Sequence, residues 1–214
     1  AFKKTTEQWA NKILKPVTMK LTEARKKAVK RYTGSYYSTV NNGLRGKTGT
    51  GGKLRINEAL SATDSKNIRL IDEAMSPMKE DIIVYRGTNA ISDATGKVLD
   101  MKNLEGTIIG DFGFQSASVG DSAAFGSTTI KLKISVQKGV KAVYANPLSG
   151  HSERELLLQR GLRMYVRGVT KDGSRYVLDV VAIPDSVSIP GLSEVMKVPF
   201  YKQLEAMWRS LVTA

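Results

Sequence analysis

The sequence predicts one α+β domain, because helical spacing of apolar residues dominates its first third and strand-like patterns dominate the rest. The chain has 214 residues, of which 41% are hydrophobic and 25% charged, a composition typical of a globular domain with a sizeable core. Helices that precede a series of strands are characteristic of α+β folds. Disordered and collagen-like chains are excluded by this composition.

Three helical segments are expected before residue 80. Thr5 and Gln8 fit a capping box at the start of the first. The second combines an apolar stripe with a basic polar face; the stripe is Leu21, Ala24, Ala28, Val29 and Tyr32, and the face is Arg25, Lys26, Lys27, Lys30 and Arg31. Five glycines within residues 43–53 predict a loop. Asp64 is the candidate N-cap of the third helix, whose stripe of Ile68, Ile71 and Met75 ends before Pro77.

Strands are expected from residue 82 onward. A β-rich run at 82–85 ends in Arg86 and Gly87, and apolar residues alternate with polar ones at 128–136, which predicts a half-buried strand. Further strands are predicted at 107–116, 140–145, 153–158, 162–169 and 176–183. An Asp172-Gly173 turn joins the last two. Residues 193–214 mix apolar and charged side chains, and Pro199 is a candidate start for a final helix that packs on the domain or links it to something else.

Positive charge is concentrated at the N-terminal end. The net charge is +13, and residues 1–55 hold 14 Lys or Arg against Glu7 and Glu23, which places +12 in the first quarter and +1 in the remainder. Two interpretations stay open: a solvated helical face, or a surface that docks on nucleic acid, an acidic protein or a charged cofactor.

Composition also excludes several kinds of site. Without cysteine the chain has no disulfide, thiolate metal ligand or Cys nucleophile. His151 is the only histidine, which argues against a His-rich zinc site or a Ser-His-Asp triad, so no metal is expected. No apolar run approaches the ~20 residues of a membrane span, and no signal peptide is expected in this chain.

Arg86 is the first candidate functional residue. A guanidinium binds phosphate through a planar fork of donors, and the glycine after it lets a ligand approach the backbone. The structural alternative is a strand-end arginine paired with a surface carboxylate.

Two serines after Phe114, Ser116 and Ser118, form the second candidate. A hydroxyl that points from a strand into a cleft can fix a catalytic carboxylate by hydrogen bonding. The structural alternative is a sheet edge whose serines face solvent.

Glu153 and Glu155, which precede three leucines, form the third candidate. Carboxylates at i and i+2 of an extended chain point to the same side. Adjacent like charges are unfavourable, which favours a functional role, such as stabilising a sugar oxocarbenium ion and orienting a nucleophile. The structural alternative is a solvated edge with both glutamates exposed.

Taken in order, these three motifs resemble the Arg-Ser-Glu class of mono-ADP-ribosyltransferases, over about residues 21–183. The segments Tyr32-Thr33-Gly34 and Asn41-Asn42-Gly43-Leu44-Arg45 are similar to the helical lead of bacterial binary-toxin and phage enzymes of this class. The resemblance implies an ADP-ribosyltransferase fold. A basic helical lobe (1–80) would lie on a core (81–185) of two packed antiparallel or mixed sheets around an NAD cleft, followed by a helical C-terminal extension (186–214).

The resemblance also implies a role for each candidate in the NAD site. Arg86 would bind the NAD phosphates, and the Gly87 backbone would contact the nicotinamide amide. Phe125 would support the nicotinamide ring. Ser116 would hold the catalytic glutamate, and Ser118 is the second serine of the same motif. Its middle residue, usually Thr, is Ala117 here.

The resemblance further implies how the two glutamates divide the reaction. Glu155 would bond the ribose 2′-hydroxyl and stabilise positive charge as nicotinamide leaves, and Glu153 would orient or deprotonate the acceptor. A Glu-x-Glu motif is associated with arginine acceptors. The turn before Glu153 usually presents an aromatic residue to the target, whereas Gly150 and His151 occupy it here; His151 can equally be a loop residue without a role.

The expected function is therefore transfer of ADP-ribose from NAD to an arginine of a target protein, with NAD hydrolysis as a side activity and no metal. A monomer with an acidic-surfaced target is expected. Such an enzyme would be a secreted toxin or be delivered by a phage into the host cytoplasm. The alternative is a basic module that binds nucleic acid through residues 1–55 and performs no catalysis.

Overall fold

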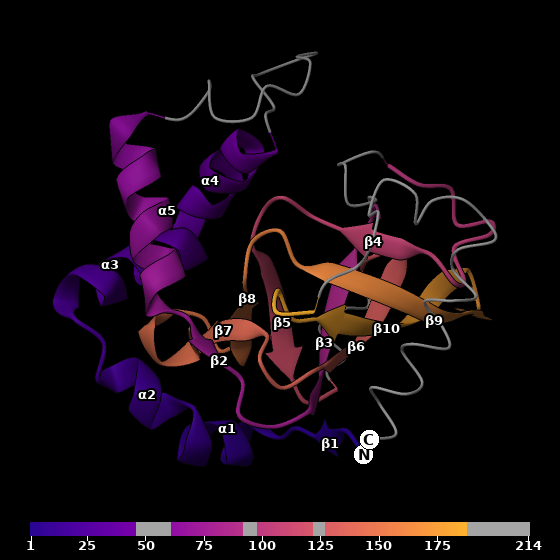
Figure 1. Ribbon diagram of the computed structural model, residues 1–214, viewed down its shortest axis with the longest axis horizontal. Helices are drawn as coiled ribbons and strands as arrows, with labels where there is room; N and C mark the ends of the chain where they lie inside the picture. Colours follow the sequence, from indigo (N-terminus) through magenta and orange to yellow (C-terminus); the bar gives the residue numbers. More distant parts are fainter. Residues whose placement is uncertain (46–60, 92–97, 122–126, 188–214) are drawn as a thin grey trace.

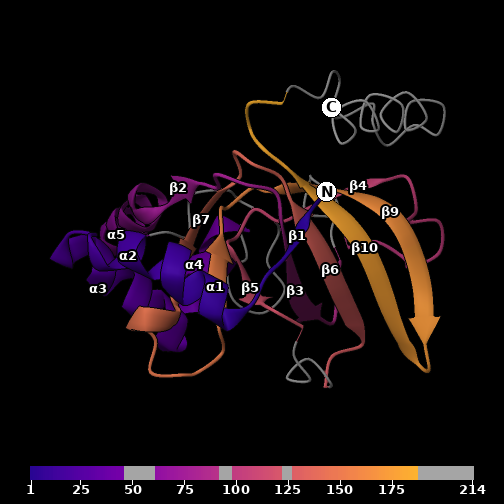
Figure 2. The same ribbon diagram turned by 90° about the horizontal axis from the view of Figure 1, so that it is seen from below.

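The computed structural model describes residues 1–45, 61–91, 98–121 and 127–187. In these ranges the helices gather on one side of a strongly curled sheet (Figures 1 and 2). The α+β class and the helical N-terminal part are confirmed. No helix in the described ranges is long and apolar enough to cross a membrane. The predicted C-terminal helix lies outside the described residues.

Five α-helices build the helical lobe: α1 (Glu7–Ile13), α2 (Lys15–Met19), α3 (Glu23–Arg31), α4 (Tyr37–Leu44) and α5 (Ala62–Ala74). Between α3 and α4, the segment η1 (Tyr32–Tyr36) bends at Gly34, whose ψ of −122° is not helical. The loop predicted from residue 43 is not present at residues 43 and 44, because α4 continues to Leu44; the rest of the predicted loop, from residue 46, lies outside the described ranges.

Two predicted helix caps are wrong. Thr6, not Thr5, caps α1 by accepting a hydrogen bond from the Trp9 backbone. Thr5 is buried, and its hydroxyl donates to the Ile83 carbonyl at 2.6 Å and accepts from the Gly120 N–H at 2.9 Å. Tertiary bonds to the sheet therefore take this hydroxyl away from the helix.

The second wrong cap is Asp64. The residue that caps α5 is Ser61, whose hydroxyl accepts a hydrogen bond from the backbone N–H of Asp64 in the first turn. On α3, the predicted burial of Ala28 and Val29 is confirmed, whereas Ala24 is exposed. Arg25 does not lie on a free polar face, because it is half-buried and pairs with Glu73 of α5 at 3.4 Å.

The strands of the described ranges are β1 (Lys3–Lys4), β2 (Ser76–Pro77), β3 (Ile82–Thr88), β4 (Ile108–Gly110), β5 (Gln115–Val119), β6 (Ile130–Val136), β7 (Lys141–Tyr144), β8 (Glu155–Leu158), β9 (Arg163–Asp172) and β10 (Arg175–Ile183). The strand predicted at 107–116 is wrong as one element, because the chain turns between β4 and β5. The other predicted strands are present with shifted ends, and the Asp172-Gly173 turn joins β9 to β10 as predicted.

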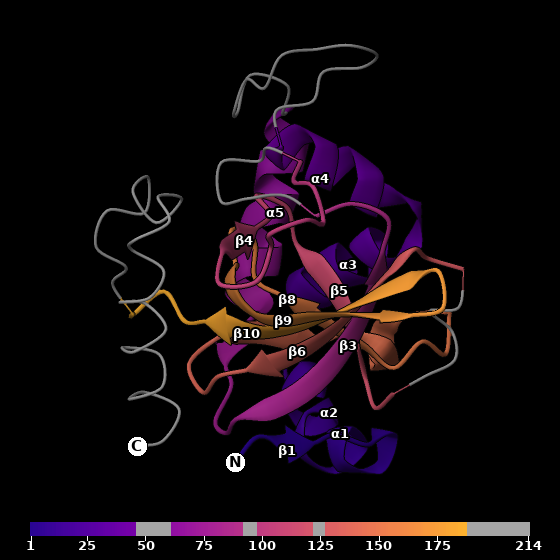
Figure 3. The ribbon, with the colours of Figure 1, turned by 90° about the vertical axis from the view of Figure 1, so that its right-hand side faces the viewer.

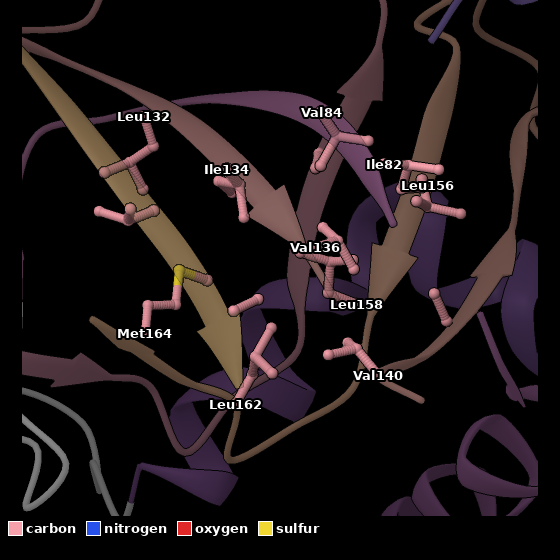
Figure 4. Packing of buried hydrophobic residues seen from close by; sticks show 14 of the residues in the cluster. Ile82, Val84, Leu132, Ile134, Val136, Val140, Leu156, Leu158, Leu162 and Met164 are labelled. Carbon is pink, nitrogen blue, oxygen red and sulfur yellow. The ribbon is translucent and has the colours of Figure 1, made fainter. Parts of the chain in front are cut away.

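These strands follow the order β2-β7-β8-β5-β3-β6-β10-β9-β4, with β1 beside β3. Strand β3 joins the two halves of this mixed sheet (Figure 3): it pairs with β6 over seven residues but with β5 only at Val84 and Tyr85. The halves pack on each other around one apolar core (Figure 4), which includes Val84 of β3, Ile134 of one half and Leu156 of the other. The two packed sheets of our expectation are thus connected through β3.

A second core lies between the helical lobe and the outer face of β8. Leu156 and Leu158 belong to the core within the sheet, whereas Leu157 packs with Val29 and Ile71 of the lobe. This alternation explains why β8 is apolar on both faces. Glu155, two residues before Leu157, therefore lies on the face toward the helical lobe.

We predict that Ile134→Ala lowers the free energy of unfolding by about 2–5 kcal/mol, since it leaves a cavity in the core within the sheet. Ile134 is 0% exposed. The matched control is Val98→Ala, at a side chain that is 63% exposed, and it should change the free energy by about 0.5 kcal/mol or less. Urea titration measures both; similar values would contradict the assignment of Ile134 to the core.

Candidate functional site

A cleft of about 520 Å³ lies between the helical lobe and the sheet. Helical residues on one side and sheet residues on the other line it; among them are Tyr32, Asn41, Arg45, Arg86, Ser116, His151, Glu153 and Glu155. All three motifs found in the sequence therefore meet in one cleft. In the described part of the chain no group of three or more His, Asp or Glu side chains is placed to hold a metal ion.

The Ser116 hydroxyl donates a hydrogen bond of 2.6 Å to Oε1 of Glu155. The two residues are brought together by pairing of β5 with β8, in which Ser118 lies opposite Glu155. Glu155 is only 6% exposed. Burial and the neighbouring charge of Glu153 raise the pKa of Glu155, while the Ser116 hydroxyl and the positive charge of Arg86 act in the opposite direction. Ser116 thus holds a carboxylate whose charge is unfavourable in this position.

Arg86 lies beyond the point where β3 stops pairing with β5. Its Nη1 donates to the Ser116 carbonyl at 2.9 Å, and it forms no salt bridge with any residue of the described ranges. Burial lowers the pKa of the Arg86 guanidinium. This placement differs from a strand-end arginine paired with a surface carboxylate. The remaining donors of the fork are available to an anion in the cleft.

Glu153 reaches the same cleft through a turn and not through an extended strand. Arg154, between the two glutamates, has a φ of 51°, a left-handed conformation that is uncommon outside glycine. Its N–H donates to Oδ1 of Asn146 in the short helix η3 (Asn146–Leu148), and its carbonyl accepts from Val119. The turn is thereby fixed on both sides, and an uncommon backbone conformation held in this way is typical of functional sites.

Of the other predicted site residues, Ser118 and Gly87 do not line the cleft, whereas His151 does. Ser118 is outside the cleft lining, and its hydroxyl donates to the Glu153 carbonyl at 2.9 Å, so it supports the turn. Gly87 lies opposite Lys131 in the β3–β6 ladder. Phe125 lies outside the described residues. His151 lines the cleft with an exposed side chain.

The helical side of the cleft supplies groups that our motif search did not single out by role. Arg45, the C-cap residue of α4, makes a bidentate salt bridge to Asp111, with distances of 2.8 and 2.7 Å. Although burial disfavours the charged carboxylate, these bonds lower the pKa of Asp111. Asn41 and Tyr32 bond to each other at 2.8 Å. The spacing Asn41-x-x-x-Arg45 places both side chains on one helix face, and this was the sequence feature that could have identified them.

Comparison with known proteins agrees with this geometry. The model of the ADP-ribosyltransferase exoenzyme family matches residues 6–183. No curated protein sequence matches the chain. Among solved structures, the Clostridium limosum C3 exoenzyme is 22% identical with a TM-score of 0.69, over 86% of this chain and 98% of its own.

Two further solved structures are similar. Plx2a, an ADP-ribosyltransferase toxin from Paenibacillus larvae, is 25% identical with a TM-score of 0.65, over 83% of this chain and 94% of its own. C3stau2 from S. aureus, solved with NAD, is 22% identical with a TM-score of 0.69, over 86% of this chain and 100% of its own. With the family model covering most of the chain, the protein belongs to the ADP-ribosyltransferase exoenzyme family and is an NAD-dependent ADP-ribosyltransferase.

Proposed function

We propose that the protein transfers the ADP-ribose group of NAD to an arginine side chain of a target protein, and that it hydrolyses NAD when water replaces the arginine. One observation carries the proposal: the cleft holds a buried glutamate bonded to Ser116 and, two residues earlier, an exposed glutamate. The buried Glu155 suits the sugar of NAD. The exposed Glu153 can be reached by a side chain on another protein.

Arginine side chains provide the binding energy for the NAD diphosphate in this proposal. Arg86 has no carboxylate partner in the described ranges, so its charge is available to the phosphates. Arg45 shares its guanidinium with Asp111, which fixes its position and offsets its charge. The bond of Arg86 to the Ser116 carbonyl places the phosphate-binding group beside the residue that holds Glu155.

Glu155 acts on the bond between nicotinamide and ribose. When this bond breaks, nicotinamide leaves with the electron pair and the ribose gains positive charge at its anomeric carbon. A carboxylate already fixed by Ser116 stabilises that charge without reorganisation, and the low exposure of the site strengthens the interaction. The unfavourable burial of Glu155 in the free enzyme is consistent with such a role.

Glu153 acts on the acceptor. A carboxylate attracts the arginine guanidinium, whereas a glutamine at this position would offer no charge. As a guanidinium nitrogen bonds to the anomeric carbon, it must lose a proton, and the Glu153 carboxylate accepts it. The fixed turn at Arg154 holds this base in the cleft that Glu155 also lines.

The basic N-terminal residues attract an acidic surface of the target in this proposal. Seven exposed ones form no salt bridge with described residues: Lys4, Lys12, Lys15, Lys20, Lys27, Lys30 and Arg31. Their charge is therefore available for long-range steering. Membership of an enzyme family argues against a nucleic-acid-binding module without catalysis.

Similarity to a C3 exoenzyme and to an ADP-ribosyltransferase toxin supports a role as a toxin. Secretion or phage delivery, a monomeric state and an acidic surface on the target stay predictions from the sequence.

Glutamine substitutions separate the roles of the two glutamates. Glu155→Gln should lower the rate of NAD hydrolysis and of protein labelling together, by about a hundredfold to a thousandfold, because it removes charge stabilisation in the transition state. Glu153→Gln should abolish labelling of polyarginine yet retain nicotinamide release. Chromatography of nicotinamide and transfer of labelled ADP-ribose measure the two activities. Parallel loss of both in Glu153→Gln would contradict the proposed division.

Arg86→Lys should weaken NAD binding roughly tenfold to a hundredfold, since the loss of one charge-assisted hydrogen bond is worth about 1.5–3 kcal/mol. Isothermal titration calorimetry measures the affinity. Arg163→Lys is the matched control: this half-buried arginine bonds the Pro184 and Val187 carbonyls away from the cleft, so NAD affinity should not change. Unchanged affinity in Arg86→Lys, with a large fall in thermal midpoint, would make Arg86 a structural residue.

Glu155→Gln should raise the thermal midpoint at neutral pH. The pKa of Glu155 is raised above its ordinary 4.5 in the folded state, so the folded protein binds the proton more tightly than the unfolded chain. The penalty for the charged form develops as pH rises from 4.5 through the folded pKa, and below 4.5 it vanishes. The gain in midpoint should therefore disappear in acid. Glu153→Gln, at an exposed side chain, should change the midpoint less; a lower midpoint for Glu155→Gln at pH 7 would contradict the argument.

A further inference from the structure

The side chain of Asn41 binds the backbone of Phe114 as a neighbouring strand would. Oδ1 accepts from the Phe114 N–H at 3.0 Å, and Nδ2 donates to the Phe114 carbonyl at 3.3 Å. Nδ2 also donates to the Tyr32 hydroxyl at 2.8 Å. Asn41 is 6% exposed, and these bonds use both donors of its amide. Although Asn41 lines the cleft, its amide is occupied by the protein itself.

Gly113 permits this close approach. A Cβ atom at this position would lie 2.7 Å from Oδ1 of Asn41, which is too short for any non-bonded contact. The ring of Tyr32 packs edge-on against Phe114 with a centroid distance of 5.6 Å. Burial raises the pKa of the Tyr32 hydroxyl to about 12, so it remains neutral and can accept from Asn41 while it donates to the Phe114 carbonyl.

Phe114 immediately precedes β5, and Ser116 is the second residue of that strand. The same helix, α4, also binds this segment one turn later through the Arg45–Asp111 salt bridge. The helical lobe therefore fixes the start of β5 at two points. A shift of Phe114 would be passed along two residues of backbone to the hydroxyl that holds Glu155.

We propose that Asn41 is a positioning residue for the transferase reaction: its amide holds the Phe114 backbone and thereby keeps the Ser116 hydroxyl on the Glu155 carboxylate. The inference rests on the proposed roles of Ser116 and Glu155. It assigns Asn41 no direct contact with NAD. Its loss should act on the rate of bond cleavage and on the ionisation of Glu155, with a smaller effect on NAD binding.

The pH profile of kcat for NAD hydrolysis tests this connection. The charged and titratable groups around Glu155 are Arg86 of β3, Glu153 and His151 of the preceding turn, and Tyr32 of η1. They are the same in every variant below. A displaced Ser116 no longer lowers the pKa of Glu155, so the acid limb of the profile should move to higher pH.

We predict that Asn41→Ala lowers kcat by about tenfold to a hundredfold, the effect of a small misplacement of a catalytic group. Its acid limb should lie at higher pH than that of the unaltered protein, while the KM for NAD changes less. Gly113→Ala keeps the asparagine at position 41 but pushes its amide away from Phe114. It should also lower kcat and move the acid limb to higher pH. The double variant should be no slower than Asn41→Ala, because both changes break the same contact.

Thr18→Val is the matched structural control. The Thr18 hydroxyl is a buried donor to the Tyr144 carbonyl at 2.8 Å, so it also joins the helical lobe to the sheet, but away from the cleft. Thr18→Val should lower the thermal midpoint without changing kcat or the acid limb. If Asn41→Ala does not fold, as judged by circular dichroism, Gly113→Ala carries the test.

Three outcomes would overturn the inference. A raised KM for NAD with unchanged kcat and acid limb would show that Asn41 binds NAD directly. A lower thermal midpoint alone, as in Thr18→Val, would make Asn41 merely structural. If the losses in kcat of the two single variants multiply in the double variant, Gly113 and Asn41 act through different contacts. Ser116→Ala distinguishes these from failure of the proposed function: if it keeps kcat and the acid limb, the Ser116–Glu155 pair itself is unimportant.

Discussion

The hydrogen bond from Ser116 to Glu155 is the interaction on which the site depends. It holds a carboxylate in a position where burial and a second glutamate disfavour its charge. Beside it, Arg86 donates a hydrogen bond to the carbonyl of the same serine, and the Ser118 hydroxyl donates to the carbonyl of Glu153 in the adjoining turn. One short strand, β5, thus positions Arg86, Glu155 and the turn that carries Glu153.

The architecture of the sheet explains why these groups meet. Strand β3 pairs fully with β6 but only briefly with β5, and beyond Tyr85 Arg86 is no longer in the β3–β5 ladder. On β8 the residues alternate between two cores, which turns Glu155 toward the helices. The helical lobe closes the other side and binds the start of β5 through α4. The cleft therefore lies beside the core that joins the helical lobe to the sheet, and Tyr32 and Phe114 of that core line it.

Much of the fold follows from local pattern. Alternation at 128–136 and the apolar runs at 82–85 and 156–158 identified strands, since side chains of a strand point to opposite faces. The helix ends were predicted less accurately. Thr5 does not cap α1, because its hydroxyl bonds to residues 83 and 120, and no local pattern reveals partners so distant in the sequence. The chain also turns between β4 and β5, where Asp111 bonds to Arg45, 66 residues earlier.

Residue types and their spacing were enough to predict the α+β class, the order of the Arg, Ser and Glu motifs and the family they resemble, because none of these depends on contacts between distant residues. Three other features follow from the folded chain alone: Ser118 supports a turn, Arg154 is left-handed, and Asn41 binds Phe114 from a helix 73 residues away. Hydrogen bonds between distant residues depend on how the sheet curls and how the lobe packs, and neither is encoded in local periodicity.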